Sequence, residues 1–267
     1  MFLSPAQLYE QMQAQDPLCI VDLSKVEIYA AGHVPGACHL DETRMLRVAK
    51  PVGGLLPDEQ SLSRLLSDLG IDVQTQVVAY DDQGNSRSAR FIWTLEVLGH
   101  RLGAVLDGGL SAWQAVGQEV SQNICTATPG NPYPVQIRTD VQADKNWILE
   151  HLDDDDVVIL DVRTEKEYQG EDVRSLRGGH VPGAISYNWL RSQDPERNRG
   201  LRPLHHLRSE LEQLGVDPGK QIVVYCQTHM RSSHTFLLLR QLGYQRLRGY
   251  PGAWSDWGND PGLPIEK

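Results

Sequence analysis

The sequence has few cysteines and no long apolar run. Its 267 residues include four scattered cysteines, and no two of them stand at the Cys-x-x-Cys spacing of a structural zinc site: Cys19, Cys38, Cys125 and Cys226. Four such cysteines are too few for a disulfide framework, so we expect all four thiols to be free. No stretch of about 18 uncharged apolar residues is present, so we expect no membrane-spanning helix.

Positive charge is also scarce. The chain has 25 Lys and Arg residues against 35 Asp and Glu residues, a formal net charge of −10. A nucleic-acid-binding protein needs a cationic face, so we expect no nucleic-acid partner. The first residues, MFLSPAQLYEQMQAQ, lack the basic start and apolar run of a signal peptide. Together with the free thiols, this predicts a cytoplasmic protein.

The chain consists of two similar halves. Four segments recur in the same order: 20–37 as 159–184, 76–82 as 221–227, 98–101 as 242–245, and 106–113 as 247–254. Because the period is as long as a domain, the repeat is a duplication and not a solenoid. Residues 121–136 contain three prolines and few apolar anchors, which predicts an extended linker between the halves.

The local pattern alternates between strands and helices. Short apolar runs at 157–160 and 221–225 predict buried strands. Leucines at helical spacing, followed by a terminal glycine, predict helices at 61–70, 207–215 and 232–243. This alternation predicts an α/β fold in which each half is a mainly parallel sheet flanked by helices.

One cysteine stands where a nucleophile is expected. Cys226 directly follows the predicted strand 221–225, and the short loop 227–231 leads to the predicted helix at 232–243. In such a turn, backbone N–H groups and the helix N-terminus favour a thiolate over a thiol. Arg231 adds a cation whose planar fork suits an oxyanion. We therefore expect Cys226 to be a nucleophile and the other three cysteines to be packing residues.

With both halves and this loop in view, the chain resembles a tandem-domain rhodanese, a thiosulfate:cyanide sulfurtransferase. The resemblance covers nearly the whole chain and is carried by DVRTEKEYQG (161–170), GGHVPGA (178–184), VVYCQTHMRSS (223–233) and LRGYPGAWSDWG (247–258). The loop CQTHMRS is close to that of bacterial rhodaneses that carry CQTHxRS. The resemblance implies a non-catalytic domain at 1–120, a linker at 121–138 and a catalytic domain at 139–267.

The first half lacks the cysteine. Asp81 matches Cys226, because Tyr80 aligns with Tyr225, and a carboxylate cannot carry a sulfane sulfur. The loop of the first half is also one residue longer, with Arg87 six positions after Asp81. The resemblance implies that this half supports the other half and that Asp81 is structural.

The reaction implied by the resemblance passes through a persulfide on Cys226. The thiolate takes the outer sulfur of thiosulfate, and a thiophilic acceptor such as cyanide or a thiol removes it, with no metal or organic cofactor. Lys166 and Glu167 lie near the site by the same resemblance, without an assigned role. Besides Cys226, the residues expected to bind substrate are the loop residues Gln227, Thr228, His229, Met230 and Arg231, and Trp189 as an apolar wall.

Three alternatives stay open. A cysteine phosphatase has Cys-x5-Arg, whereas Cys226 and Arg231 form a tighter Cys-x4-Arg loop, suited to a sulfur atom. A 3-mercaptopyruvate sulfurtransferase typically has a Cys-Gly-Ser-Gly loop, whereas His229 and Arg231 favour the thiosulfate dianion, although Gln227 and Thr228 replace the basic residues of mammalian thiosulfate enzymes. A carrier that delivers the persulfide to a protein acceptor would share the first half-reaction. His229 itself either contacts substrate or is exposed to solvent.

Several other polar residues are expected to be structural. His33 and His180 occupy matching GHVPGA turns, and His33 lies in the half without the cysteine. Asp22 and Asp161 end matching strands, where a buried carboxylate that anchors a loop is expected. The pair 205–206, two histidines without ligand partners at metal spacing, predicts a solvated helix start.

Overall fold

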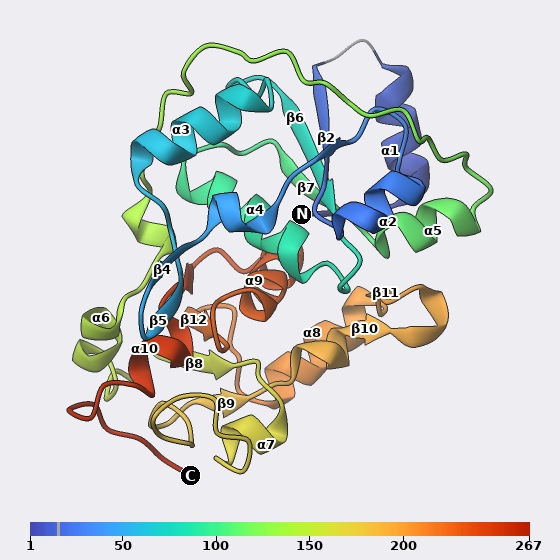
Figure 1. The fold of residues 1–267 in the computed structure, drawn as a ribbon. Coiled ribbons are helices and arrows are strands. Elements are labelled where there is room, and N and C mark those ends of the chain that lie inside the picture. Colours follow the sequence, from blue (N-terminus) through green and yellow to red (C-terminus); the bar gives the residue numbers. More distant parts are fainter. Residues whose placement is uncertain (15–16) are drawn as a thin grey trace. The chain divides into compact units, whose positions relative to one another are not determined.

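The chain divides into two units that do not follow the two sequence halves throughout. The computed structural model describes residues 1–14 and 17–267 (Figure 1). Unit 1 comprises Met1–Met45, Pro57–Arg138 and Asp194–Leu201, and unit 2 comprises Leu46–Leu56, Thr139–Gln193 and Arg202–Lys267. The segments 46–56 and 194–201 are therefore each grouped with the half to which they do not belong in the sequence.

Unit 1 is built on a five-stranded parallel sheet with the strand order β1-β7-β6-β2-β3. The strands are β1 (Phe2–Leu3), β2 (Leu18–Asp22), β3 (Cys38–His39), β6 (Gln76–Tyr80) and β7 (Gly103–Leu106). The last four residues of β2 and of β6 are buried. Such continuous burial is expected of central strands that are covered on both faces.

Helices cover both faces of this sheet. In Figure 1, α3 (Glu59–Asp68) and α4 (Ser86–Val97) lie on one side, and α1 (Pro5–Gln13), α2 (Val26–Ala31) and α5 (Gly109–Ala115) lie on the other. α1 begins at a capping box between Ser4 and Gln7, and the Asp58 side chain caps α3. The short elements of the unit are the 3₁₀ helices η1 (Glu42–Met45) and η4 (Pro195–Arg197) and the strand β11 (Gly200–Leu201).

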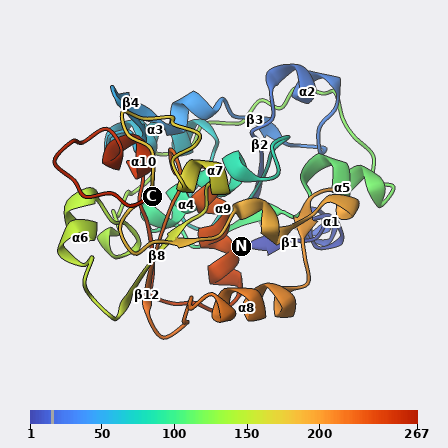
Figure 2. The same cartoon turned by 90° about the horizontal axis from the view of Figure 1, so that it is seen from below.

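Unit 2 repeats this arrangement around a four-stranded parallel sheet with the order β13-β12-β8-β9. The strands are β8 (Val157–Asp161), β9 (Ile185–Ser186), β12 (Gln221–Tyr225) and β13 (Leu247–Gly249). In Figure 2, α8 (Leu204–Gln213) and α9 (Arg231–Gln241) lie on one side, and α6 (Lys145–Glu150), α7 (Glu165–Tyr168) and α10 (Ala253–Trp257) on the other. The remaining short elements are the antiparallel hairpin of β4 (Arg47–Ala49) and β5 (Val52–Leu55) and the 3₁₀ helices η2 (Thr139–Val141) and η3 (Trp189–Ser192). The two residues of β10 (Gln193–Asp194) are divided between the units.

Equivalent residues of the two halves form the two cores. Tyr80 and Trp113 are buried in unit 1, and their repeats Tyr225 and Trp254 are buried in unit 2. The hydroxyl of Tyr80 accepts a hydrogen bond from the Val34 amide at 3.0 Å, and the hydroxyl of Tyr225 accepts one from the amide of the matching valine at 3.1 Å. Within each unit, the same hydrogen bond therefore joins the tyrosine at the end of a strand to the valine of the GHVPGA turn, as expected of a duplication.

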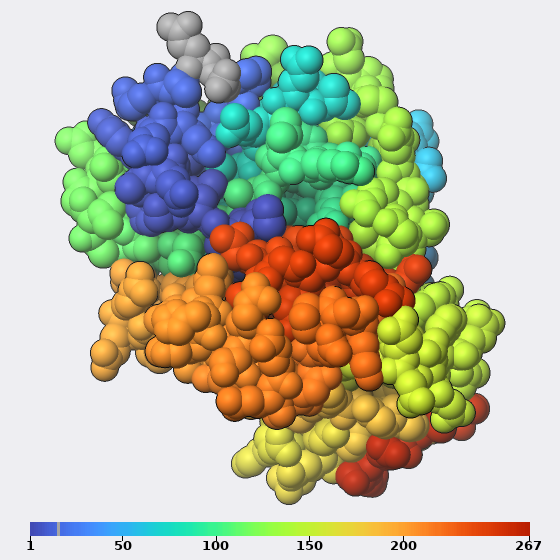
Figure 3. All heavy atoms as spheres, turned by 180° about the vertical axis from the view of Figure 1, so that it is seen from behind, coloured from blue at the N-terminus to red at the C-terminus, as the bar shows by residue number. Residues whose placement is uncertain are grey.

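The predicted strands and helices are confirmed. β8 and β12 coincide with the predicted strands, and α3, α8 and α9 with the predicted helices to within a few residues. The glycines that follow these helices, at positions 70, 215 and 243, have positive φ angles of 68°, 87° and 90°, as a helix C-terminus requires. Both histidines of 205–206 are exposed at the start of α8. Figure 3 shows the orange segment that contains this helix at the surface. No helix within 1–14 and 17–267 is long and apolar enough to cross a membrane.

The expectation that all four thiols are free is wrong for one pair. Cys38 and Cys125 form a disulfide across a separation of 87 residues, with their Cα atoms 4.9 Å apart. The coil after Ser121 returns to unit 1, where the Cys125 amide donates to the hydroxyl of Tyr29 at 3.1 Å. This tertiary contact brings the two cysteines together, and no sequence spacing reports it. Cys19 and Cys226 are free and buried.

Candidate active site

Cys226 lies at the carboxyl end of the parallel sheet of unit 2. It directly follows β12, and α9 begins five residues later at Arg231. Its carbonyl accepts a hydrogen bond from the Trp254 amide at 3.0 Å, and the carbonyl of Gln227 accepts one from the Ser255 amide at 3.0 Å. The start of α10 therefore fixes the backbone of the loop, and the predicted strand–loop–helix placement of the thiol is confirmed.

The surroundings of Cys226 favour its thiolate. Only 1% of the residue is exposed. Burial alone would raise the pKa of the thiol, but the Arg231 cation and hydrogen bonds from the Ser232 hydroxyl, the Ser232 amide and the Thr228 amide outweigh it and lower the pKa. Cys19 shows the effect of burial without such donors, because its pKa is raised to about 12. Of the two free thiols, Cys226 is therefore the one whose pKa is lowered.

Arg231 is held by a buried carboxylate. Its two terminal nitrogens donate to the two oxygens of Glu167, at 2.7 Å from Nη1 to Oε2 and 2.8 Å from Nη2 to Oε1. Glu167 is fully buried, and burial acts against its charge, but the paired guanidinium outweighs this and lowers the pKa of the carboxyl to about 2. The sequence placed Glu167 near the site without a role, and the structure makes it the partner of Arg231.

His229 braces the loop from inside. The residue is fully buried, so the alternative that it is exposed to solvent is wrong. Its Nδ1 lies 2.7 Å from the Ser232 hydroxyl, and its carbonyl accepts a hydrogen bond from the Ser233 hydroxyl at 2.5 Å. The same Ser232 hydroxyl also forms a hydrogen bond with the Cys226 sulfur. His229 also has a φ of 60°, which bends the chain around the sulfur.

The other predicted site residues lie around this loop. The Gln227 side chain is partly buried and donates to the Ser175 hydroxyl at 3.1 Å. Met230 is partly exposed and immediately precedes α9. Trp189, in η3, is 8% exposed and packs edge-to-face on His234 of α9, with 5.5 Å between the ring centroids. Trp189 therefore contacts the helix that follows the loop.

A hairpin from the first sequence half belongs to this site and was not predicted. Gly53 in β5 donates its amide to the Ser255 hydroxyl at 3.0 Å, and that hydroxyl donates to the Gly53 carbonyl at 3.2 Å. The next residue, Gly54, packs so closely on the loop that an added Cβ would lie 2.2 Å from the Thr228 carbonyl oxygen. The Gly-Gly pair in PVGGLL is the only trace of this contact in the sequence.

The matching loop of unit 1 is filled by its own carboxylate. Asp81 is buried, and burial raises its pKa despite the hydrogen bonds that it accepts. Its donors are the amides of Gln83 (2.7 Å), Asn85 (2.9 Å), Arg87 (2.8 Å) and Ser88 (2.8 Å) and the Ser88 hydroxyl (3.0 Å). Arg87 pairs with Glu42 and Asp82. An amide-lined loop thus encloses a negative group in both units, a carboxylate in one and a sulfur in the other.

The histidines of the GHVPGA turns and the strand-end aspartates are buried and hydrogen-bonded within the protein, which agrees with the expectation that they are structural. His33 Nδ1 contacts the Tyr29 carbonyl at 2.8 Å, and His180 Nδ1 contacts the Tyr168 carbonyl at 2.9 Å. Asp161 is fully buried and pairs with Arg163 at 2.6 Å. Within the described ranges 1–14 and 17–267, no three His, Cys, Asp or Glu side chains form a group that could hold a metal ion.

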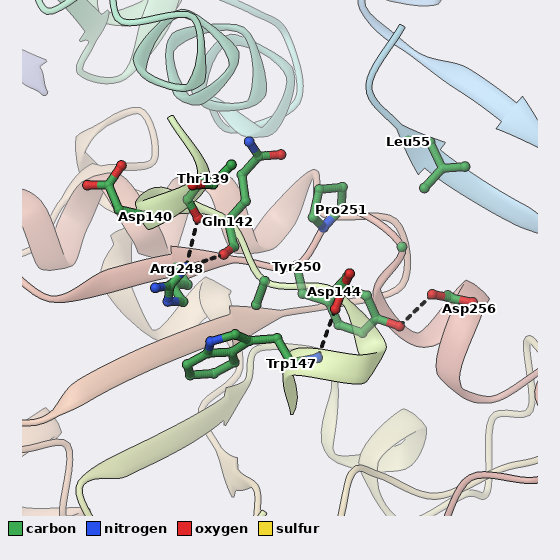
Figure 4. Close-up of a pocket in the computed structure, with 12 residues that line it drawn as sticks. Leu55, Thr139, Asp140, Gln142, Asp144, Trp147, Arg248, Tyr250, Pro251 and Asp256 are labelled. Carbon is green, nitrogen blue, oxygen red and sulfur yellow. Dashed lines mark hydrogen bonds between the residues drawn. The ribbon is translucent and has the colours of Figure 1, made fainter. Parts of the chain in front are cut away.

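A separate cavity of about 600 Å³ lies in unit 2 (Figure 4). Arg248 crosses it, donating from Nη1 to the carbonyls of Thr139 at 2.7 Å and Gln142 at 2.6 Å, with its guanidinium 4.8 Å from the ring centroid of Trp147. None of the residues that line it in the described part of the chain belongs to 226–231. This cavity therefore contains neither Cys226 nor the loop that follows it.

Comparison with known proteins gives one consistent result. A family model for the rhodanese-like domain matches residues 4–116 and 144–260. The chain is 39% identical over 264 residues to a thiosulfate sulfurtransferase of Azotobacter vinelandii and 38% identical to one of Pseudomonas aeruginosa, covering 99% of this chain and 96% of each relative. It is 33% identical over 253 residues to a sulfur carrier protein, TtuD, of Thermus thermophilus, covering 90% of this chain and 87% of that protein.

Solved structures show the same fold. The anaerobic ergothioneine biosynthesis enzyme of Chlorobium limicola, in complex with trimethyl histidine, superposes with a TM-score of 0.88 at 22% identity, covering 100% of this chain and 70% of that one. At this identity the likeness concerns the fold alone. The family model matches each half separately, which confirms the duplication.

Proposed function

The chain belongs to the rhodanese family, and we propose that it is a thiosulfate sulfurtransferase whose nucleophile is Cys226. The observation that carries this proposal is the environment of the Cys226 thiol. Cys226 is buried, its pKa is lowered, and it accepts hydrogen bonds at the N-terminus of α9 beside Arg231. In the matching loop of unit 1, Asp81 leaves no group that could carry sulfur.

The proposed reaction has two steps and needs only thiosulfate and cyanide as reactants. The Cys226 thiolate attacks the outer sulfur of thiosulfate; an S–S bond forms to Cys226, the S–S bond of thiosulfate breaks, and its electron pair leaves with sulfite. Cyanide then attacks the outer sulfur of the persulfide, thiocyanate leaves, and the thiolate is restored. The donors at Thr228 and Ser232 that stabilise the thiolate also suit the negative charge of the persulfide.

Intact mass after treatment with thiosulfate tests this proposal. We expect a gain of one sulfur, about 32 Da, that cyanide reverses and that Cys226→Ala abolishes. Cys19→Ala is the matched control, because Cys19 is the other free buried thiol and should leave the gain unchanged. A gain that persists in Cys226→Ala, or its absence from the unmodified chain, would contradict the proposal.

The sulfur donor is proposed to be thiosulfate rather than 3-mercaptopyruvate. The curated relatives that resemble this chain over nearly its whole length bear the thiosulfate name. We expect kcat/KM to be higher for thiosulfate, and the reverse order would assign the chain to the mercaptopyruvate class. Hydrolysis of an aryl phosphate without sulfur transfer would instead assign it to the cysteine phosphatases.

A second candidate function is delivery of the persulfide sulfur to a protein acceptor. It is supported by the resemblance to the sulfur carrier of T. thermophilus. Mixing the labelled persulfide form with candidate acceptor proteins, then following the label by mass, separates a carrier from an enzyme that serves cyanide or small thiols. In either role Cys226 must be a free thiol at the start of each cycle, which a reducing compartment such as the predicted cytoplasm favours, whereas a disulfide such as Cys38–Cys125 is rare in that compartment.

We propose that the catalytic part of the chain is unit 2. It extends the predicted catalytic domain, 139–267, by the hairpin at 46–56, and it excludes 194–201. The first half, 1–120, is proposed to be non-catalytic, with Asp81 as a structural residue, and the coil at 121–138 as the linker. An Asp81→Asn variant that still forms the persulfide on Cys226 would agree with this division.

A further inference from the structure

Glu167 has an unusual set of partners for a residue of a short helix. Besides the two terminal nitrogens of Arg231, its Oε2 accepts hydrogen bonds from the Thr164 amide at 3.1 Å and the Thr164 hydroxyl at 3.0 Å. The same hydroxyl accepts a hydrogen bond from the Glu167 amide at 3.3 Å, which completes a capping box at the start of α7. The carboxylate is therefore fixed by the backbone of unit 2 before any substrate binds.

The geometry limits what Arg231 can offer to an anion. A guanidinium binds a carboxylate or sulfonate best through two parallel N–H groups. In Arg231 both terminal nitrogens already donate to Glu167, and 18% of the Arg231 side chain is exposed, against none for Glu167. An incoming anion can therefore reach only the N–H groups that Glu167 leaves uncovered.

Charge leads to the same conclusion. The thiolate and the carboxylate are both negative, and the guanidinium between them is their shared counter-ion. Arg174 adds a more distant cation, 3.6 Å from Glu167 Oε1 and half exposed, but it also pairs with Asp172 at 2.8 Å. Asp161 also acts on Arg231, but only Glu167 pairs with both of its terminal nitrogens, so without Glu167 more of the Arg231 charge would act on Cys226 and on an anion at the sulfur.

We propose that Glu167 is a positioning residue that fixes Arg231 beside Cys226 and weakens the hold of Arg231 on anions. This inference rests on the proposed sulfur transfer, in which the sulfite dianion must leave and an anionic acceptor must then approach an anionic persulfide. A cation that is too strong would retain sulfite and slow each turnover. Glu167 thus lowers the affinity for thiosulfate and speeds the release of sulfite.

Alkylation of Cys226 by two matched reagents tests the inference. Iodoacetate and iodoacetamide react with the same thiolate by the same displacement, and only iodoacetate carries a negative charge. The ratio of their rates at Cys226, followed by peptide mass, therefore reports the local attraction for an anion and is independent of the thiolate fraction. For Glu167→Gln we expect this ratio to rise on the order of tenfold and the pH midpoint of alkylation to fall by about one unit.

Two controls separate charge from structure. Glu165→Gln removes a neighbouring acidic side chain of α7 that does not pair with Arg231, and it should leave the ratio unchanged. Thr164→Val breaks the hydroxyl part of the capping box but keeps the ion pair, so it should lower Tm and leave the ratio unchanged. A purely structural Glu167 would instead make Thr164→Val and Glu167→Gln alike.

Each outcome decides the inference. A ratio in Glu167→Gln that equals or falls below that of the unmodified chain overturns it. If Glu167→Gln does not fold, Glu167→Asp is used in its place. Its side chain is one methylene shorter, so it should raise the ratio of the iodoacetate and iodoacetamide rates by a smaller factor. An unchanged ratio in Glu167→Asp would then overturn the inference. Inhibition by sulfite should tighten in parallel. Alkylation requires no sulfur transfer, so an absent persulfide in the unmodified chain would contradict the proposed function and leave this test intact.

Discussion

Replacing Gly54 by alanine is expected to disable Cys226 while the protein stays folded. Gly54 lies in β5 with a φ of +74°, and an added Cβ would meet the Thr228 carbonyl oxygen at 2.2 Å and its carbonyl carbon at 2.8 Å. Thr228 is also the residue whose amide donates to the Cys226 sulfur. The clashing carbonyl and this amide flank the same Cα atom, so a shift of the Thr228 backbone moves a donor away from the thiolate.

The size of the effect follows from the overlap. Real Cβ atoms essentially never come closer than 3.0 Å, so the hairpin and the loop must separate by at least 3.0 − 2.2 = 0.8 Å. A misplacement of about 1 Å in a reacting site costs on the order of 100-fold in rate. The left-handed backbone adds a cost of about 1–2 kcal/mol for a residue with a Cβ. We therefore expect kcat/KM to fall about 100-fold and stability to fall by about 1–2 kcal/mol.

Gly183→Ala is the matched control for this experiment. Gly183 lies in the same unit with a φ of +71°, but an added Cβ there would meet no atom within 4 Å. Both variants should lose similar stability in a thermal melt, and only Gly54→Ala should lose activity in the thiosulfate and cyanide assay. If kcat/KM of Gly54→Ala stayed within about twofold of that of Gly183→Ala, the hairpin would be yielding instead of the loop, and the reasoning would be refuted.

Four further predictions concern the charged groups. Ser232→Ala removes a hydrogen bond to the Cys226 thiolate, so the pH midpoint of alkylation should rise by about one unit; an unchanged midpoint would remove Ser232 from the site. Arg231→Ala leaves the buried Glu167 carboxylate unpaired and should lower the free energy of unfolding by about 3 kcal/mol in urea, whereas adding Glu167→Gln should restore most of it. Because the Glu167 pKa is lowered to about 2, its contribution of about 3 kcal/mol is present above pH 4.5 and lost as the pH falls towards 2; circular dichroism should show a flatter acid limb for Glu167→Gln. Asp81→Ala leaves the amides of its loop unsatisfied and should cost about 3 kcal/mol, while the persulfide still forms on Cys226.

The local sequence pattern was sufficient to predict β12 and α9, the strand and the helix on either side of the Cys226 loop. The apolar run at 221–225 and the leucine spacing at 232–243 report on their own neighbours in the chain, so β12 and α9 followed from the sequence. The repeat added that Asp81 is the counterpart of Cys226. The position of the thiol at the carboxyl end of a buried parallel strand was thus available without a structure.

The contacts that tune the thiol were not available, because they join residues far apart in the sequence. Gly54 and Thr228 are separated by most of the chain, and Glu167 and Arg231 by 64 residues. The charge of Arg231 suggested a free anion binder, since nothing in the local sequence shows that a buried carboxylate already holds it. The burial of His229 could not be predicted for a similar reason, because the polar loop sequence does not reveal its left-handed backbone.

The two loops together indicate what is general in the fold and what is particular to the chemistry. Both loops direct amide donors at a buried acidic group, and in unit 1 the Asp81 carboxylate accepts hydrogen bonds from four of these amides. In unit 2 the same place holds one sulfur atom, which carries its charge on a single larger and more polarisable atom. A sulfur that ionises at the helix N-terminus can accept a second sulfur and remain within reach of the donors. The loop therefore provides anion stabilisation in both units, and we propose that a thiol in place of the carboxylate, beside Arg231 and Glu167, makes the loop of unit 2 a site for sulfur transfer.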